Sequence, residues 1–122
     1  MMNALHQAKQ LQDRTKKFAI RTIKAFARLP KDEATRIIAR QFLRSGTSLA
    51  ANYRPACRAR SRADFISKIS MVTEEADETF FWFELLVEAN LVKMKLVEPL
   101  MKECEELLKI FSASLATAKR NR

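Results

Sequence analysis

Arginine side chains recur in this sequence at spacings that could form a surface for phosphate groups. Two rows have a spacing of four residues, which places each row along one side of a helix. The first row is Arg36, Arg40 and Arg44, and the second is Arg54, Arg58 and Arg62, with Arg60 beside it. Guanidinium groups bind phosphate oxygens bidentately, so such rows suit the backbone of RNA or DNA.

The arginines leave two interpretations open, phosphate binding and a solvated face paired with acids. For the second cluster we predict nucleic-acid binding, with Arg54, Arg58, Arg60 and Arg62 as the binding residues. Arg44 is flanked by small residues, and we expect it to pair with Glu75 or Glu78 in a buried polar network that also includes Asn52. A third, weaker stripe is interpreted as a solvated face and consists of Lys17, Arg21, Lys24 and Arg28.

The other reactive residue types form no catalytic or metal-binding pattern. Carboxylate-bridged metal sites in helical bundles need a Glu-x-x-His pair from each of two helices, and this chain has one histidine, His6. Cys57 and Cys104 have neither metal-ligand spacing nor a neighbouring base. A single glycine, Gly46, cannot form a glycine-rich phosphate loop. We therefore predict no metal, no cofactor and no enzymatic activity.

The charge of the chain is concentrated in its first half. The net charge is +9. Residues 1–62 carry 15 Lys or Arg against 3 acids, whereas residues 63–122 carry 8 against 11. Such asymmetry indicates a surface for a polyanion, with pairing between the two halves as the alternative.

Length and composition favour one small domain spanning residues 1–122. The 122 residues include one glycine and three prolines, and no linker-like tract interrupts them. No window approaches the roughly 18 apolar residues of a membrane span. The N-terminus mixes charges into its first turns, unlike an export signal. We expect a cytoplasmic protein with reduced thiols.

Hydrophobic spacing predicts four helices and no strands, over residues 4–29, 31–58, 62–90 and 97–118. Pro30 is expected at the opening of the second helix, and Pro99 in the first turn of the fourth. Ser61 and Asp64 have the spacing of a capping box at the start of the third. Four such helices with short connections predict an all-α, antiparallel up-down-up-down bundle.

The third predicted helix carries more apolar surface than the interior of one bundle requires. A stripe through Phe65, Ile69 and Phe83 would face the core. Phe81, Trp82 and Leu85 face another way, and we predict that they form an oligomer interface. Aromatic side chains could also stack on bases, but their position beside the core stripe favours the interface.

The central segment resembles a known protein family in several short runs. These runs are Arg44-Ser45-Gly46-Thr47-Ser48, Ala51-Asn52-Tyr53, Ala56-Cys57-Arg58-Ala59-Arg60-Ser61, Asp64-Phe65-Ile66-Ser67-Lys68, Glu75-Ala76-Asp77-Glu78-Thr79 and Trp82-Phe83-Glu84-Leu85-Leu86. Together with Glu106-Leu107-Leu108-Lys109-Ile110, they closely resemble the four-helix-bundle proteins encoded in intervening sequences of bacterial large-subunit ribosomal RNA genes. Relatives of that family include the accessory proteins of diversity-generating retroelements.

The resemblance implies a bundle that assembles into a homopentameric ring and associates with nucleic acid. In the retroelement branch it also implies association with a reverse transcriptase. We therefore predict a non-enzymatic, RNA-binding bundle that presents arginine clusters on an oligomeric ring. The alternative is a structural adaptor that docks a mobile-element enzyme such as a reverse transcriptase.

One residue departs from the family pattern, because Pro55 stands where the family usually has a glutamate. A proline inside a helix removes one backbone hydrogen bond and clashes with the preceding turn, at a cost of roughly 3 kcal/mol. The second helix is therefore expected to kink near Arg54 or to end there.

Overall fold

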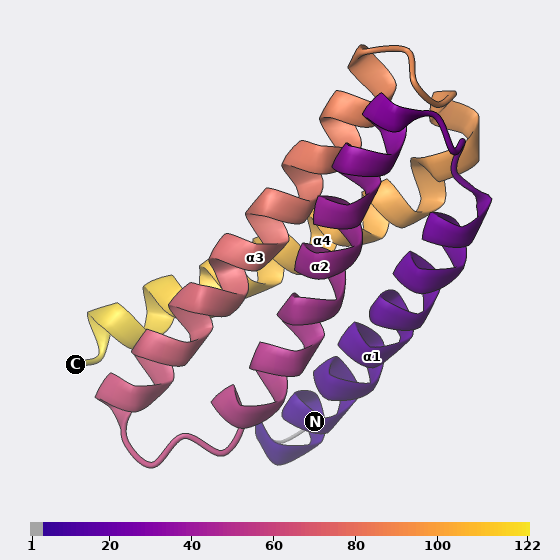
Figure 1. Cartoon of the computed structure of the whole chain (residues 1–122). Coiled ribbons are helices and arrows are strands. Elements are labelled where there is room, and N and C mark those ends of the chain that lie inside the picture. Colours follow the sequence, from indigo (N-terminus) through magenta and orange to yellow (C-terminus); the bar gives the residue numbers. More distant parts are fainter. Residues whose placement is uncertain (1–3) are drawn as a thin grey trace.

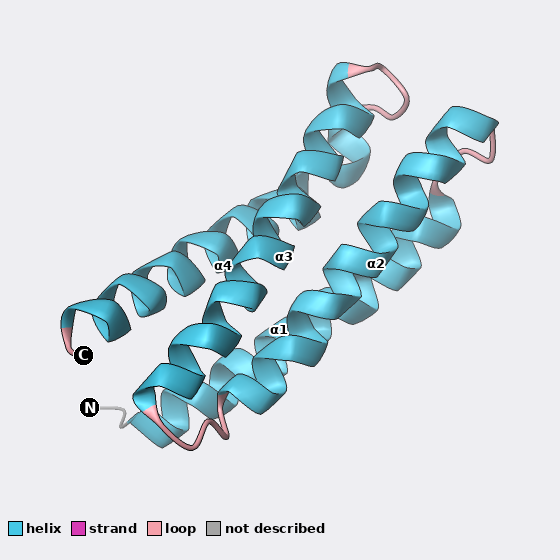
Figure 2. Cartoon of the chain, turned by 60° about the vertical axis from the view of Figure 1, so that its left-hand side comes forward, coloured by secondary structure: helices cyan, strands magenta, loops and turns pink. Residues whose placement is uncertain are grey.

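Residues 4–122 are described by the computed structural model, with side chains from His6 onward. Within this range the chain forms four α-helices and no strands: α1 (Ala4–Arg28), α2 (Glu33–Ala56), α3 (Arg62–Glu88) and α4 (Met94–Arg120). The all-α, four-helix prediction is confirmed. Each helix turns back alongside the preceding one after a short connection (Figure 1), and the loops are confined to the ends of the helices (Figure 2).

Side-chain caps define the starts of α2 and α3. The Asp32 carboxylate accepts a hydrogen bond from the Thr35 backbone N–H at 3.1 Å. Because Asp32 is the N-cap, α2 begins at Glu33, and Pro30 precedes the helix instead of opening it. Ser61 accepts from the Asp64 backbone N–H at 3.0 Å, at the start that the capping-box spacing indicated.

The connection between α3 and α4 lies earlier in the chain than predicted, because α3 ends at Glu88 and α4 begins at Met94, where we expected 90 and 97. Asn90 has a φ of 58° and follows the C-cap of α3, a left-handed position that asparagine tolerates. The Leu91 N–H donates to the Leu86 carbonyl at 3.0 Å, which closes the turn. As a result α4 begins at Met94, and Pro99 is its sixth residue, beyond the first turn where we expected it.

The core joins all four helices through large aromatic side chains. One fully buried phenylalanine comes from each helix, and these residues are Phe18, Phe42, Phe83 and Phe111. The Phe42 and Phe83 rings meet edge to face with centroids 4.8 Å apart, a favoured aromatic geometry. The interhelical contacts of α2 and α3 are therefore dense.

Small side chains in the middle of α2 allow both neighbouring helices to approach closely. A Cβ atom added at Gly46 would lie 2.7 Å from the Thr22 Cγ2 of α1, too close for a real contact. On the other side, the hydroxyl groups of Ser45 and Thr79 are hydrogen bonded at 2.8 Å, and both residues are fully buried. The small centre of α2 therefore sets its distance to α1 and its register with α3.

The seam between α1 and α4 is much less closely packed than the other three. Its best-defined contact is an ion pair in which the Arg14 guanidinium donates to both Glu103 carboxylate oxygens at 2.7 Å. None of the four described helices combines the length and apolar character that a membrane crossing requires.

Candidate nucleic-acid interface

Three of the four predicted arginines gather around one basic hollow at the end of α2. The hollow has a volume of about 650 Å³ and is lined by Arg54, Pro55, Arg58, Arg60, Asp64 and Lys68. We call this set of residues the basic hollow. It is formed by the last turn of α2, the connection to α3 and the first turns of α3.

The basic hollow has an excess of unpaired positive charge. Its one acid, Asp64, is already paired, because both of its carboxylate oxygens accept from Lys68 Nζ at 2.7 Å. The hydrogen bond from Lys68, followed by one from the Arg60 backbone N–H, lowers the pKa of the Asp64 carboxyl. Arg54, Arg58 and Arg60 are exposed, and none of their guanidinium groups lies within ion-pair distance of an acid among the described residues. The charge of Arg60 makes only the smallest contribution to the lowered pKa of Asp64. These three groups are therefore available to a phosphate backbone.

Arg62, the fourth predicted residue, lies apart from the basic hollow. It borders a separate hollow, whose other lining residues include Phe65 of α3 and Thr117 of α4. The four-residue spacing misplaced Arg62 because α2 ends at Ala56, so the row of arginines does not stay on one helix. The turn residues Arg58 and Arg60 reach the hollow from an irregular connection, which a helical pattern cannot describe.

Pro55 lies in the last turn of α2 and is followed by one more helical residue, Ala56. The chain then forms a turn, in which the Arg58 N–H donates to the Pro55 carbonyl at 3.0 Å. The carbonyl that loses its partner is that of Ala51, an exposed residue, so water can satisfy it. Pro55 therefore acts at the end of the helix and not in its interior.

Restoring glutamate at this position should accordingly change stability very little. We expect Pro55→Glu to alter the free energy of unfolding by less than about 1 kcal/mol, well below the cost of an interior proline. Urea unfolding of both proteins at one concentration measures the difference. A gain of about 3 kcal/mol would show that proline strains the body of α2.

Arg44 forms the ion pairs that we predicted, but it is not buried. Arg44 forms ion pairs with Glu75, at 3.3 Å, and with Glu78. These pairs link α2 to α3 at the surface, since the Arg44 side chain is 49% exposed. Pairs in such positions stabilise a protein by less than about 1 kcal/mol. Arg44 is engaged within the chain and does not join the basic hollow.

Asn52 does not belong to this network, contrary to our expectation. Its amide Nδ2 donates to the backbone carbonyl and the hydroxyl of Ser48, one turn earlier in α2, both at 2.9 Å. The buried polar link between α2 and α3 is instead the pair of Ser45 and Thr79. The signal for it was present in the sequence as small hydroxyl residues within two apolar stripes.

The predicted oligomer interface is a mixed surface of exposed and half-buried groups. Phe81 is 49% exposed and packs edge to face against Trp82, with ring centroids 5.2 Å apart. Trp82 and Leu85 are half-buried. The indole N–H of Trp82 is buried without an acceptor among the described residues. Ile37 of α2 is also exposed.

The remaining candidate residues are distributed over other parts of the bundle. Three members of the third stripe, Arg21, Lys24 and Arg28, border a hollow of about 250 Å³ between α1 and α4. Cys104 is fully buried, and burial raises the pKa of its thiol, while Cys57 is half-buried. No group of His, Cys, Asp or Glu in the described range is arranged to hold a metal ion.

Comparison with known proteins assigns the chain to a family. A model of the 23S rRNA-intervening sequence protein matches residues 8–113. The chain belongs to this family. The resemblance inferred from the runs of α2 and α3 is thereby confirmed, and the match includes every residue of the basic hollow.

One solved structure has a similar fold. It is a protein of unknown function from the S23 ribosomal protein family of Bacteroides thetaiotaomicron VPI-5482, 34% identical to this chain. The match covers 85% of this chain and 96% of that one, with a TM-score of 0.77. No curated protein sequence matches. The two matches show that the chain shares the fold of this family.

Proposed function

We propose that this protein is a non-enzymatic RNA-binding member of its family and that the basic hollow holds the phosphate backbone. The observation that carries the proposal is the set of three exposed arginines, Arg54, Arg58 and Arg60, which have no ion-pair partner in the described structure. Arginine forks match phosphate oxygens, and such contacts dominate affinity for nucleic acid. The family description, which names an intervening sequence of 23S rRNA, supports RNA as the polyanion.

We also propose that the antiparallel bundle assembles into a ring-like homo-oligomer, for which the resemblance suggests a pentamer. Support comes from the apolar surface of Phe81, Trp82 and Leu85, which one chain leaves partly open to solvent. A ring would repeat the basic hollow around its circumference. Repeated weak sites on one particle bind a long ligand far more tightly than a single site does.

The experiment is a comparison of two charge-matched double variants. Replacing Arg58 and Arg60 by alanine should weaken binding to all RNA sequences alike. It should also flatten the slope of log affinity against log salt by roughly one to two units. Arg36 and Arg40 are exposed on α2 outside the basic hollow, so Arg36→Ala with Arg40→Ala removes the same charge as a control.

Fluorescence anisotropy with a labelled stem-loop RNA gives both quantities. We expect the Arg58 and Arg60 variant to lose affinity and the control to keep most of it, with helicity unchanged in both. Equal losses in the two variants would mean that net charge, and not the basic hollow, binds RNA. An absence of RNA binding by the wild type at low salt would remove this function and favour the adaptor that docks a mobile-element enzyme.

A further inference from the structure

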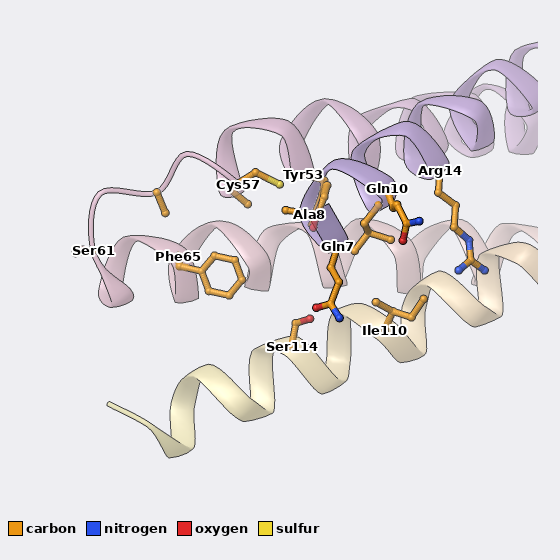
Figure 3. A pocket seen from close by; sticks show the side chains of 13 residues that line it. Gln7, Ala8, Gln10, Arg14, Tyr53, Cys57, Ser61, Phe65, Ile110 and Ser114 are labelled. Carbon is orange, nitrogen blue, oxygen red and sulfur yellow. The ribbon is translucent and has the colours of Figure 1, made fainter. Parts of the chain in front are cut away.

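A second hollow lies on the other side of the turn that joins α2 to α3. Its volume is about 710 Å³, within the range of roughly 300–1,000 Å³ typical of small-ligand sites. Figure 3 shows side chains from all four helices around it, including Gln7 and Gln10 of α1, Phe65 of α3 and Ser114 of α4. The hollow borders the seam between α1 and α4, which is the least closely packed of the four.

The lining offers flat apolar surfaces and amide groups. Phe65, Ile110 and Tyr53 are among its apolar lining residues, and Gln7 and Gln10 provide the amides. A carboxamide both donates and accepts hydrogen bonds, and it can bind the edge of a heterocyclic base in a bidentate manner.

The hollow carries no uncompensated charge. Arg14 is its one charged lining residue, and Glu103 neutralises it through two hydrogen bonds of 2.7 Å. Burial, followed by a hydrogen bond with Cys57, raises the pKa of the Tyr53 phenol, which therefore stays neutral. A neutral planar heterocycle fits this chemistry better than a phosphate or a carboxylate does.

The connection between α2 and α3 forms a wall shared by this hollow and the basic hollow. Its successive side chains line the two hollows in alternation. Ala59 and Ser61 line the uncharged hollow. Arg58 and Arg60 line the basic one. A strand held by these arginines is thus separated from the uncharged hollow only by the connection between α2 and α3.

We propose that this uncharged hollow is a base pocket, which takes an unpaired nucleobase from the RNA strand whose phosphates lie in the basic hollow. The inference rests on the proposed RNA-binding function and adds a preference for unpaired RNA. Proteins read single-stranded RNA by stacking extruded bases on aromatic side chains and hydrogen bonding to their edges. Phe65 supplies the accessible aromatic surface, beside the 6% of Tyr53 that remains exposed, and Gln7 and Gln10 bind the base edge.

The test fills the pocket with a side chain. Ser114 lines the base pocket, so Ser114→Phe places a ring inside it. Ser112, two residues earlier in α4, is exposed and borders neither hollow, so Ser112→Phe is the matched control. Each protein is titrated with a stem-loop RNA and with the same RNA carrying abasic nucleotides in the loop. Thermal unfolding by circular dichroism verifies that both variants fold.

The wild type and Ser112→Phe should bind the intact loop roughly tenfold more tightly than the abasic loop, as expected for one stacked base. Ser114→Phe should bind both RNAs equally, with the affinity and salt slope of the wild type for the abasic loop. Equal binding of both RNAs by the wild type would overturn the base pocket and leave the phosphate site standing. Loss of all RNA binding by the wild type would overturn both.

A last measurement uses free nucleosides, because they carry the same bases as RNA and could be the ligands of the pocket themselves. Under the proposal, adenosine, guanosine, cytidine and uridine bind weakly or not at all without the phosphate contacts. Saturable binding of a free nucleoside, lost in Ser114→Phe and accompanied by equal affinity for the two RNAs, would contradict RNA as the source of the base. NMR titration detects such binding at millimolar concentrations.

Discussion

Phe83→Ala should cost about 3–5 kcal/mol of unfolding free energy, the largest stability effect that we expect in this protein. Phe83 is fully buried and meets Phe42 edge to face at 4.8 Å, where α2 and α3 pack together. Removing its ring leaves a cavity that the small centre of α2 cannot fill. Urea unfolding at a fixed protein concentration measures the loss, because self-association makes apparent stability depend on concentration.

The control is a truncation at an exposed position outside the predicted interface. Leu96 of α4 is 53% exposed, so Leu96→Ala should cost about 1 kcal/mol or less. Similar losses for the two variants would mean that Leu96 is as deeply packed as Phe83. A small loss for Phe83→Ala would contradict the core described for α2 and α3.

Trp82→Glu should dissociate the proposed oligomer while most of the helicity remains. A carboxylate in the desolvated centre of an interface lacks a partner, and burying it is costly. Multi-angle light scattering of the wild type should give a mass several times that of the 14.1 kDa chain, and the variant should approach the mass of one chain.

Ile23→Glu provides the control for this experiment. Ile23 is 53% exposed on α1, so the same charge enters on another helix, outside the predicted interface. This variant should keep the mass of the wild type. A wild type that is monomeric at micromolar concentration would contradict the predicted interface and the ring.

Local sequence signals predicted the fold well because they act over a few residues. The Ser61 and Asp64 spacing placed the start of α3, since a cap depends only on neighbouring backbone groups. Pro30 and Pro99 were placed less well. The Asp32 cap and the left-handed Asn90 decide where α2 and α4 begin, and proline alone marks neither start.

The site could be predicted only where its residues share one local segment. Arg54, Arg58 and Arg60 lie together because a tight turn follows Ala56. Arg62 was misplaced because the helix period does not continue through that turn. Asn52 satisfied its hydrogen bonds within its own helix, which spacing cannot distinguish from a contact across helices. The base pocket depends on the distance between α1 and α4, which the sequence pattern of neither helix predicts.

Phosphate binding by the basic hollow is tested most directly by the affinity of the wild type for a stem-loop RNA, measured across a series of salt concentrations. If Arg54, Arg58 and Arg60 each neutralise one phosphate, log affinity should fall linearly with log salt. The slope should be about −2 or steeper, because each contact contributes roughly 0.7 on single strands. Binding with no salt dependence, or no binding at low salt, would contradict RNA binding by these three arginines.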